Sequence, residues 1–264
     1  METKNKLLTV SKLFLALAVW FLIYKLTGLF LTPVLSERLP EVLVMIITGM
    51  VIPYTISLGA FYLIVRNMET ASPRCPEIKP GPLRLGKLFL IQCGLTIPVM
   101  IPVNMIYKMS GREMPGMTPE QILAHPVFYV ILLLVFAPVM EEFLFRKLIL
   151  DRLTVLGTTP AIIVSAAFFG LPHLFSQGPA QMLYTFVLGL MLAYVALTSR
   201  KLWPCILLHS LSNVYGAFIP TLWPKDDLPS LALYALIYIM IMPLTAVILT
   251  VLSRKEIMKV CHCT

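Results

Sequence analysis

Charged side chains are scarce in this sequence. Of its 264 residues only 13% are Asp, Glu, Lys or Arg, whereas 58% are hydrophobic, and the mean hydropathy is +0.87. An ordinary soluble domain carries about 25% charged residues, so the composition excludes that class. A spanning helix needs about 20 mainly apolar residues, and the length therefore leaves no room for a large domain outside the bilayer. We expect one integral membrane domain over residues 1–264, surrounded by the lipid bilayer.

Paired cysteines and a nucleic-acid-binding surface are also missing. The five cysteines show no paired spacing, which argues against a disulfide framework. The formal net charge is +8, but it comes without a basic stripe on a soluble fold. We therefore expect no nucleic acid partner and attribute the excess of lysine and arginine to membrane topology.

Long apolar runs recur along the whole chain, bounded by charged residues or by Pro and Gly. They predict an all-α, polytopic transmembrane helical bundle of about eight spans. The runs cover residues 9–34, 41–65, 87–107, 126–146, 158–176, 179–198, 203–220 and 230–252.

The basic residues predict the orientation of this bundle. Sixteen of the 21 lysines and arginines fall in the N-terminal tail, in segments 66–87, 146–152 and 200–201, and in the C-terminal tail. The opposite connections hold only Arg38, Lys108, Arg112 and Lys225. Because connections rich in Lys and Arg stay in the cytoplasm, we expect both termini there. Lys25 lies inside the first predicted helix and receives no role.

Two adjacent carboxylates, Glu141 and Glu142, follow an unbroken apolar stretch at 128–140. Ionisable groups in hydrocarbon cost about 2.5–3.5 kcal/mol each, so those that occur usually face a polar interior. On a helix, Glu142 and Arg146 are four residues apart and can pair, whereas Glu141 points about 100° away and stays available to a pocket. A charge pair at a helix end by the membrane interface is the alternative.

Two further apolar helices carry histidines. His173 lies four residues after Phe169, on the same helix face, and His209 precedes Asn213 by the same spacing. Two neutral hydrogen-bond donors side by side suit a developing oxyanion. For His173 alone the alternative is a packing residue, and for His209 and Asn213 it is hydrogen bonding that only holds helices together.

The three patterns follow one another on successive predicted helices. Glu141-Glu142-x-x-x-Arg146, Phe169-x-x-x-His173 and His209-x-x-x-Asn213, in this order, resemble the CAAX protease and bacteriocin-processing family, also called Abi. Its eukaryotic relatives are the Ras-converting CAAX endopeptidases. The motif-bearing core covers about residues 126–220. The resemblance implies an intramembrane endopeptidase with a peptide or protein substrate at the membrane.

The resemblance also implies a role for each motif residue. Glu141 is expected to activate water as general base with the help of His173. His209 and Asn213 are expected to hold the tetrahedral oxyanion. The orienting residues are expected to be Glu142, Arg146 and Phe169.

A metal is a second possibility for the same residues. Glu141, His173 and His209 match the ligand types of catalytic zinc sites. The sequence has no His-Glu-x-x-His motif, and these ligands would have to come from three helices. We expect a glutamate-based mechanism without a cofactor, and zinc stays open as the alternative.

Two other classes of function compete with a protease. Intramembrane Glu, His and Arg also mark transporters and proton relays, although the chain shows no inverted repeat. A non-catalytic immunity or adaptor protein is the other rival. Short connections suggest a multi-pass protein of a prokaryotic plasma membrane. There, a secreted peptide or bacteriocin precursor is at least as good a substrate as a prenylated CAAX protein.

Overall fold

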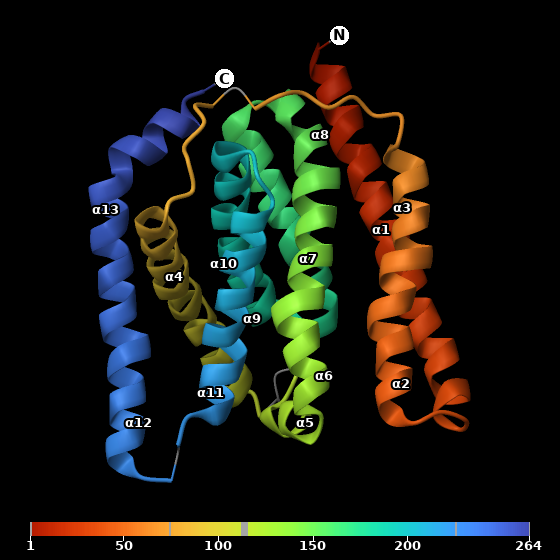
Figure 1. Cartoon of the computed structure of the whole chain (residues 1–264), viewed down its shortest axis with the longest axis vertical. Coiled ribbons are helices and arrows are strands. Elements are labelled where there is room, and N and C mark those ends of the chain that lie inside the picture. Colours follow the sequence, from red (N-terminus) through yellow and green to blue (C-terminus); the bar gives the residue numbers. More distant parts are fainter. Residues whose placement is uncertain (1, 74, 112–115, 225, 264) are drawn as a thin grey trace.

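The computed structural model describes residues 2–73, 75–111, 116–224 and 226–263, and in this part of the chain all regular structure is helical (Figure 1). Arg74, Arg112 and Lys225, which enter the charge pattern, lie outside the described residues. Seven of the described helices are long and apolar enough to cross a membrane. These helices make the chain a multi-pass helical membrane protein.

The N-terminal part is a helical hairpin. The long helix α1 (Glu2–Ser36) is followed by α2 (Glu41–Ile46), two π-helical segments, η1 (Ile47–Val51) and η2 (Pro53–Ser57), and α3 (Leu58–Val65). The indole nitrogen of Trp20 donates to the carbonyl oxygen of Pro53 at 2.8 Å. This bond ties the two arms of the hairpin together.

Helix α4 (Pro82–Met109) and the short α5 (Pro119–Ala124) lead to the helix that bears the carboxylates. In α5, Thr118 and Gln121 satisfy each other's backbone N–H groups in a capping box. The next candidate span, Pro126–Leu156, changes pitch repeatedly. Its segments are α6 (Pro126–Ile131), η3 (Leu132–Phe136), α7 (Ala137–Glu142), η4 (Phe143–Leu150), α8 (Asp151–Leu153) and η5 (Thr154–Leu156).

Helix α9 (Thr158–Ser199) contains a sharp turn at Gly178, where φ is 87° and ψ is 177°. This conformation favours glycine, because a side chain there would be strained. The halves on either side run antiparallel and pack closely. A Cβ added to Gly189 would lie 3.0 Å from Ala166 Cα, and one added to Gly170 would lie 3.0 Å from the Met182 carbonyl oxygen.

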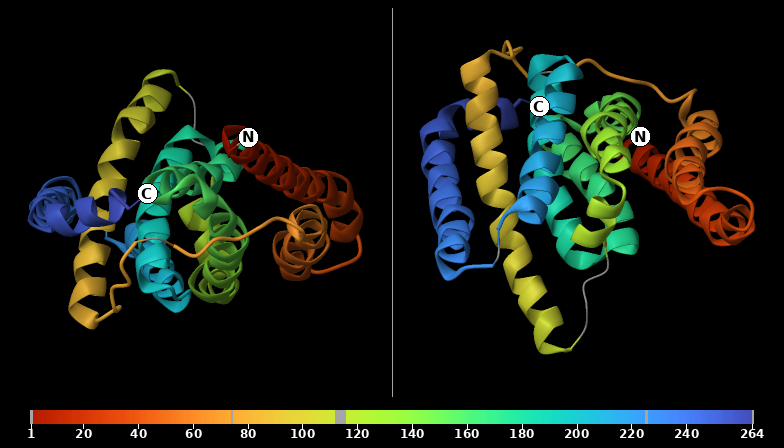
Figure 2. Two further views of the ribbon diagram at one scale, coloured as in Figure 1. Left: turned by 90° about the horizontal axis from the view of Figure 1, so that it is seen from above. Right: turned by 60° about the horizontal axis from the view of Figure 1, so that its bottom comes forward.

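The remaining helices continue the bundle. They are α10 (Trp203–Asn213), η6 (Val214–Phe218), α11 (Ile219–Leu222), α12 (Leu228–Ala235), η7 (Leu236–Ile241) and α13 (Met242–Cys261). Figures 1 and 2 show α7, α9 and α10 in the middle, flanked by α1–α3 on one side and by α4 with α12 and α13 on the other. Helix α4 contacts α13 through Gly94, where an added Cβ would overlap the Met242 carbonyl.

Among the described residues, seven helices qualify as candidate spans by length and composition, and α9 counts as one of them. Its two halves match the predicted runs 158–176 and 179–198 and are separate helices that meet at the turn at Gly178, so the eight predicted helices are present in the described part of the chain. Helix α1 begins and α13 ends at the same end of the bundle (Figure 1). The connections after α3, η5 and α9 lie at this end as well, so the basic segments gather there.

Candidate active site

One helix turn brings Glu142 and Arg146 together, as their spacing predicts. Arg146 Nε donates to Glu142 Oε2 at 2.8 Å, and both side chains are buried. Arg146 Nη1 donates to the hydroxyl of Ser165 on α9 at 3.0 Å, and the guanidinium lies 5.0 Å from the centre of the Phe169 ring. A buried charge is tolerated only when such partners surround it, so this pair fixes η4 against α9.

His209 connects the two carboxylates. Its Nδ1 lies 2.9 Å from Glu142 Oε1, and its Nε2 lies 3.8 Å from Glu141 Oε2. An ionised carboxylate can only accept a hydrogen bond, so the proton is on Nδ1 and Nδ1–H donates a hydrogen bond to Glu142. Glu142 therefore gives one oxygen to Arg146 and the other to His209. This fixes the imidazole with Nε2 directed toward Glu141.

His173 is oriented by its own helix. Its Nδ1 lies 2.9 Å from the carbonyl oxygen of Phe169, one turn earlier. A carbonyl oxygen only accepts, so Nδ1 is the protonated nitrogen and Nε2 keeps its lone pair. The centre of the Phe169 ring lies 5.4 Å from that of the His173 imidazole and 5.7 Å from that of His209. Phe169 thus contacts Arg146 and both histidines.

Helix α10 is held against the carboxylate helix by two polar side chains. The Ser210 hydroxyl donates to the Leu134 carbonyl at 2.8 Å, and Asn213 Nδ2 donates to the Leu133 carbonyl at 2.7 Å. Pro138 has no N–H to offer the carbonyls four and five positions earlier, those of Leu134 and Leu133, and both accept from α10 instead. One hydrogen of the Asn213 amide is used in this way, and its second remains for a ligand.

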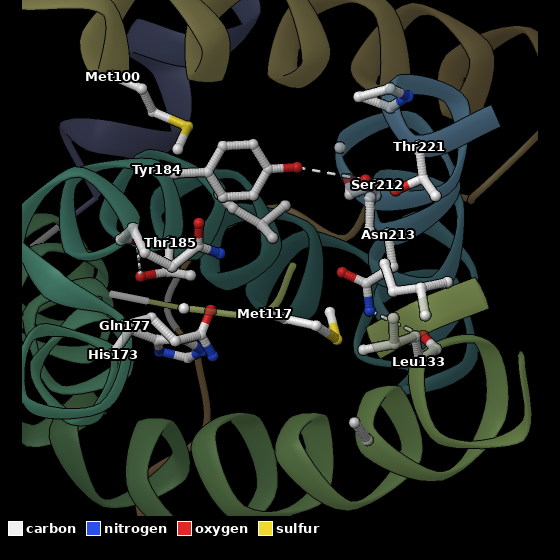
Figure 3. A pocket seen from close by; sticks show the side chains of 18 of the residues that line it. Met100, Met117, Leu133, His173, Gln177, Tyr184, Thr185, Ser212, Asn213 and Thr221 are labelled. Atoms are coloured by element: carbon white, nitrogen blue, oxygen red, sulfur yellow. Dashed lines mark hydrogen bonds between the residues drawn. The ribbon is translucent and has the colours of Figure 1, made fainter. Parts of the chain in front are cut away.

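A cavity of about 490 Å³ collects the residues expected to do chemistry (Figure 3). Glu141, His173, His209 and Asn213 all line it, and they come from α7, α9 and α10. Figure 3 shows His173 and Asn213 facing the cavity from opposite sides. None of the three residues expected to orient them lines it, namely Glu142, Arg146 and Phe169. The volume lies within the range of small-ligand sites, about 300–1,000 Å³.

Other residues that shape this site were not anticipated. Ser165 bonds Arg146, and Tyr184 and Ser212 line the cavity, with the Tyr184 hydroxyl donating to the Ser212 carbonyl at 3.2 Å. Gln92, buried on α4, donates to the carbonyl of Leu208 at 3.0 Å and also bonds the Ser212 hydroxyl. A buried glutamine in an apolar run was the available signal, but the pattern of one helix does not reveal its partner on another.

The residues that match zinc ligands by type do not form a metal site here. Among the described residues, no group of three His, Cys, Asp or Glu side chains is close enough to hold a metal ion. His209 directs its nitrogens at Glu142 and Glu141, and His173 Nδ1 is bonded to a carbonyl. The set Glu141, His173 and His209 therefore does not fit a metal in this arrangement.

The fold and the cavity define a class: a multi-pass helical membrane protein with carboxylate, imidazole and amide groups gathered inside the bundle. Residues 123–215 match the family model described as "Type II CAAX prenyl endopeptidase Rce1-like". The chain thus carries an Rce1-like CAAX endopeptidase domain over these residues, which confirms the family indicated by the motifs. The family is one of proteases. No curated protein and no solved structure matches the chain.

Proposed function

We propose that the protein is an intramembrane endopeptidase that hydrolyses a peptide bond with water activated by Glu141. The observation that carries the proposal is the cavity lined by Glu141, His173, His209 and Asn213. General bases and oxyanion donors must face one space in which a carbonyl carbon and a water molecule meet. The matched family, whose members are proteases, supports the same reaction class.

Glu141 and His173 are the groups that move protons. Glu141 accepts a proton from water while the water oxygen attacks the peptide carbonyl carbon, and His173 Nε2 holds the water through its lone pair. The carbonyl π electrons go to oxygen and form the tetrahedral intermediate. When the C–N bond breaks, the proton passes from Glu141 to the leaving amine. General acid–base catalysis of this kind contributes about 10²–10⁴-fold.

His209 and Asn213 stabilise the negative oxygen of that intermediate. Asn213 offers the amide hydrogen that Leu133 does not use. His209 donates from Nε2 only when both ring nitrogens carry protons, because Nδ1 already donates to Glu142. The two carboxylates face its two ring nitrogens, with Glu142 Oε1 2.9 Å from Nδ1 and Glu141 Oε2 3.8 Å from Nε2. Loss of one oxyanion donor typically costs about 2.7–4 kcal/mol in the barrier.

Glu142, Arg146 and Phe169 act through these residues. Glu142 fixes the His209 ring, Arg146 compensates the Glu142 charge, and Phe169 contacts both imidazoles while its carbonyl orients His173. We assign them orienting roles, because none of them lines the cavity.

The membrane setting narrows the substrate to a membrane-associated chain. We place the basic end of the bundle, with both termini, in the cytoplasm of a prokaryotic plasma membrane, following the positive-inside rule. The substrate is then either a prenylated or other membrane-associated protein cut near its C-terminus, or the precursor of a secreted peptide or bacteriocin.

Replacement of Glu141 by Gln tests the proposal. The variant keeps the size of the side chain but loses the base, so we expect peptide products to fall by at least about 10²-fold with the fold intact. Glu37→Gln, at an exposed position outside the cavities, is the matched control. The measurement is mass spectrometry of membrane peptides from cells that express each form. Unchanged products in the Glu141→Gln variant would refute the base assignment.

The same comparison separates the rival functions. A transporter would show solute or proton flux without new peptides, and an adaptor would keep its cellular phenotype in the Glu141→Gln variant. For the metal question, thorough chelation is expected to leave turnover unchanged. Loss of activity on chelation, with recovery on addition of zinc, would replace the metal-free mechanism.

A further inference from the structure

A second cavity, of about 440 Å³, adjoins the catalytic residues. Glu141 and His173 line both this cavity and the one in Figure 3. The two cavities also share five other residues, but most of the walls found only in the second come from α1 and the π-helical turns after α2, with Trp20 and Tyr54 among them. A substrate that passes Glu141 can therefore place one side of its scissile bond in each cavity.

Lys25 of α1 is the only lysine or arginine among the described residues that line this second cavity. Its ammonium lies 5.5 Å from the centre of the Phe21 ring and 5.6 Å from that of Tyr24. Within the described part of the chain, the Lys25 side chain makes no ion pair and no hydrogen bond. Lys25 contrasts with Arg146, whose charge is compensated by Glu142.

A cation without an anionic partner is costly inside a spanning helix. The insertion cost of a lysine is about 2.5–3.5 kcal/mol at the helix centre. Contact with aromatic faces offsets about 0.5–2 kcal/mol of this cost, depending on how far the ammonium is desolvated. The two rings therefore position the ammonium but do not replace a counter-ion. A bound anion in the cavity would supply that counter-ion.

We infer that Lys25 binds the free C-terminal carboxylate of the peptide substrate in this second cavity. The inference rests on the proposed endopeptidase function. Apart from Glu141 and His173 at the catalytic end, the walls hold one ammonium among aromatic, aliphatic and neutral polar side chains, which matches a group with a single negative charge. A phosphate dianion is usually held by several cationic or backbone donors, which these walls do not offer.

This subsite would set the position of the cut. An extended peptide advances about 3.3–3.6 Å per residue, so fixing its carboxylate at Lys25 fixes which bond reaches Glu141. Ser176 and Gln177, on the His173 helix, line the same cavity and offer polar groups for the peptide backbone. The enzyme would then select chain ends over internal peptide bonds.

The test compares two forms of one peptide. The probe is a fluorescent peptide with a farnesylated cysteine fourth from its end, made with a C-terminal carboxylate or with a C-terminal amide. Binding to the full chain in lipid nanodiscs is measured in the Glu141→Gln background, where turnover does not interfere. We expect the carboxylate form to bind at least roughly tenfold more tightly, which corresponds to about 1.4 kcal/mol.

Variants at Lys25 identify the source of this preference. Lys25→Met should remove it by weakening the carboxylate form alone, and Lys25→Arg should keep most of it. Lys12→Met, on the same helix but exposed and outside both cavities, should bind like the parent. Equal binding of the two forms, binding of neither form, or an unchanged preference in Lys25→Met would overturn the inference.

Turnover distinguishes this inference from the proposed function. If the chain with Glu141 intact discriminates the two forms in binding but cleaves neither, the carboxylate subsite stands and the endopeptidase proposal fails for this probe. If it cleaves both forms at equal kcat/KM, and Lys25→Met does the same, the endopeptidase stands and the subsite is refuted.

Discussion

The central helix α9 and the last candidate span, Leu228–Cys261, differ sharply in burial. In their most apolar windows, 61% of the residues of α9 are buried inside the protein, against 11% for the last span, which is the more hydrophobic of the two. A helix that faces lipid needs only apolar side chains, whereas an interior helix must fit its neighbours and pair its polar groups. Hydrophobicity therefore identifies a span, but tight packing and buried polar groups mark the interior where the site lies.

The largest expected effect comes from removing one member of the interior ion pair. Arg146→Met leaves the Glu142 carboxylate buried without its cation, and we expect the free energy of unfolding to fall by about 3–5 kcal/mol. Arg254→Met, at an exposed position of α13, is the matched control and should change it by less than about 0.5 kcal/mol. Unfolding in mixed micelles measures both. Equal free energies of unfolding for the two variants would contradict the expectation that charges on interior helices matter more for stability than charges on outer ones.

A smaller effect is expected from adding one methyl group to the α9 hairpin. Gly189→Ala would place its Cβ 3.0 Å from Ala166 Cα and 3.2 Å from the Phe169 ring. Overpacking typically costs about 1–3 kcal/mol, and displacement of Phe169 should also lower kcat. Gly28→Ala on α1, where an added Cβ meets nothing within 4 Å, should be neutral or stabilise by up to about 1 kcal/mol. Thermal unfolding and turnover of both variants check this difference; a destabilised Gly28→Ala would contradict it.

The smallest expected effect concerns the reactivity of a buried thiol in the connection between α3 and α4. Cys75 is buried, its Sγ lies 3.5 Å from the Leu197 carbonyl oxygen, and burial raises the pKa of its thiol above the ordinary value of 9.0. The thiolate is the reactive form, so Cys75 should react slowly with maleimide, and the rate should rise only at a pH above that for an exposed thiol. Ser72→Cys, exposed in the same connection, is the reference. Rates measured from pH 7 to 10, with Cys261 and Cys263 replaced by Ser, decide the point. A Cys75 profile that coincides with the Ser72→Cys profile would contradict burial.

Features that depend on one helix could be predicted from the sequence. The apolar runs located the spans because membrane helices must be long and apolar, and the spacing of Glu142 and Arg146 predicted their ion pair. The turn at Gly178 coincides with a predicted boundary and separates two of the eight predicted helices, which together count as one of the seven candidate spans.

Features that join different helices could not be predicted in the same way. His209 bonds Glu142 across 67 positions of the chain, and Asn213 bonds the Leu133 carbonyl across 80. Helical spacing says which residues share a face but not which face meets another helix. Lys25 shows the same limit, since only the fold places it in a cavity with Glu141. The catalytic roles of Glu141, His173, His209 and Asn213 stay predictions that the proposed experiments test.

Pro138 has a consequence for the alignment of the two halves of the site. It lacks an N–H, so the Leu134 carbonyl finds its donor in Ser210, the residue next to His209. A residue with an N–H at position 138 could have bonded this carbonyl within the same helix. With proline there, the hydrogen bond joins two helices instead. If α10 slid or rotated along its neighbour, that oxygen would be left unpaired in a medium without water. The proline therefore sets the register between the helix of Glu141 and the helix of His209, independently of the connections that join them.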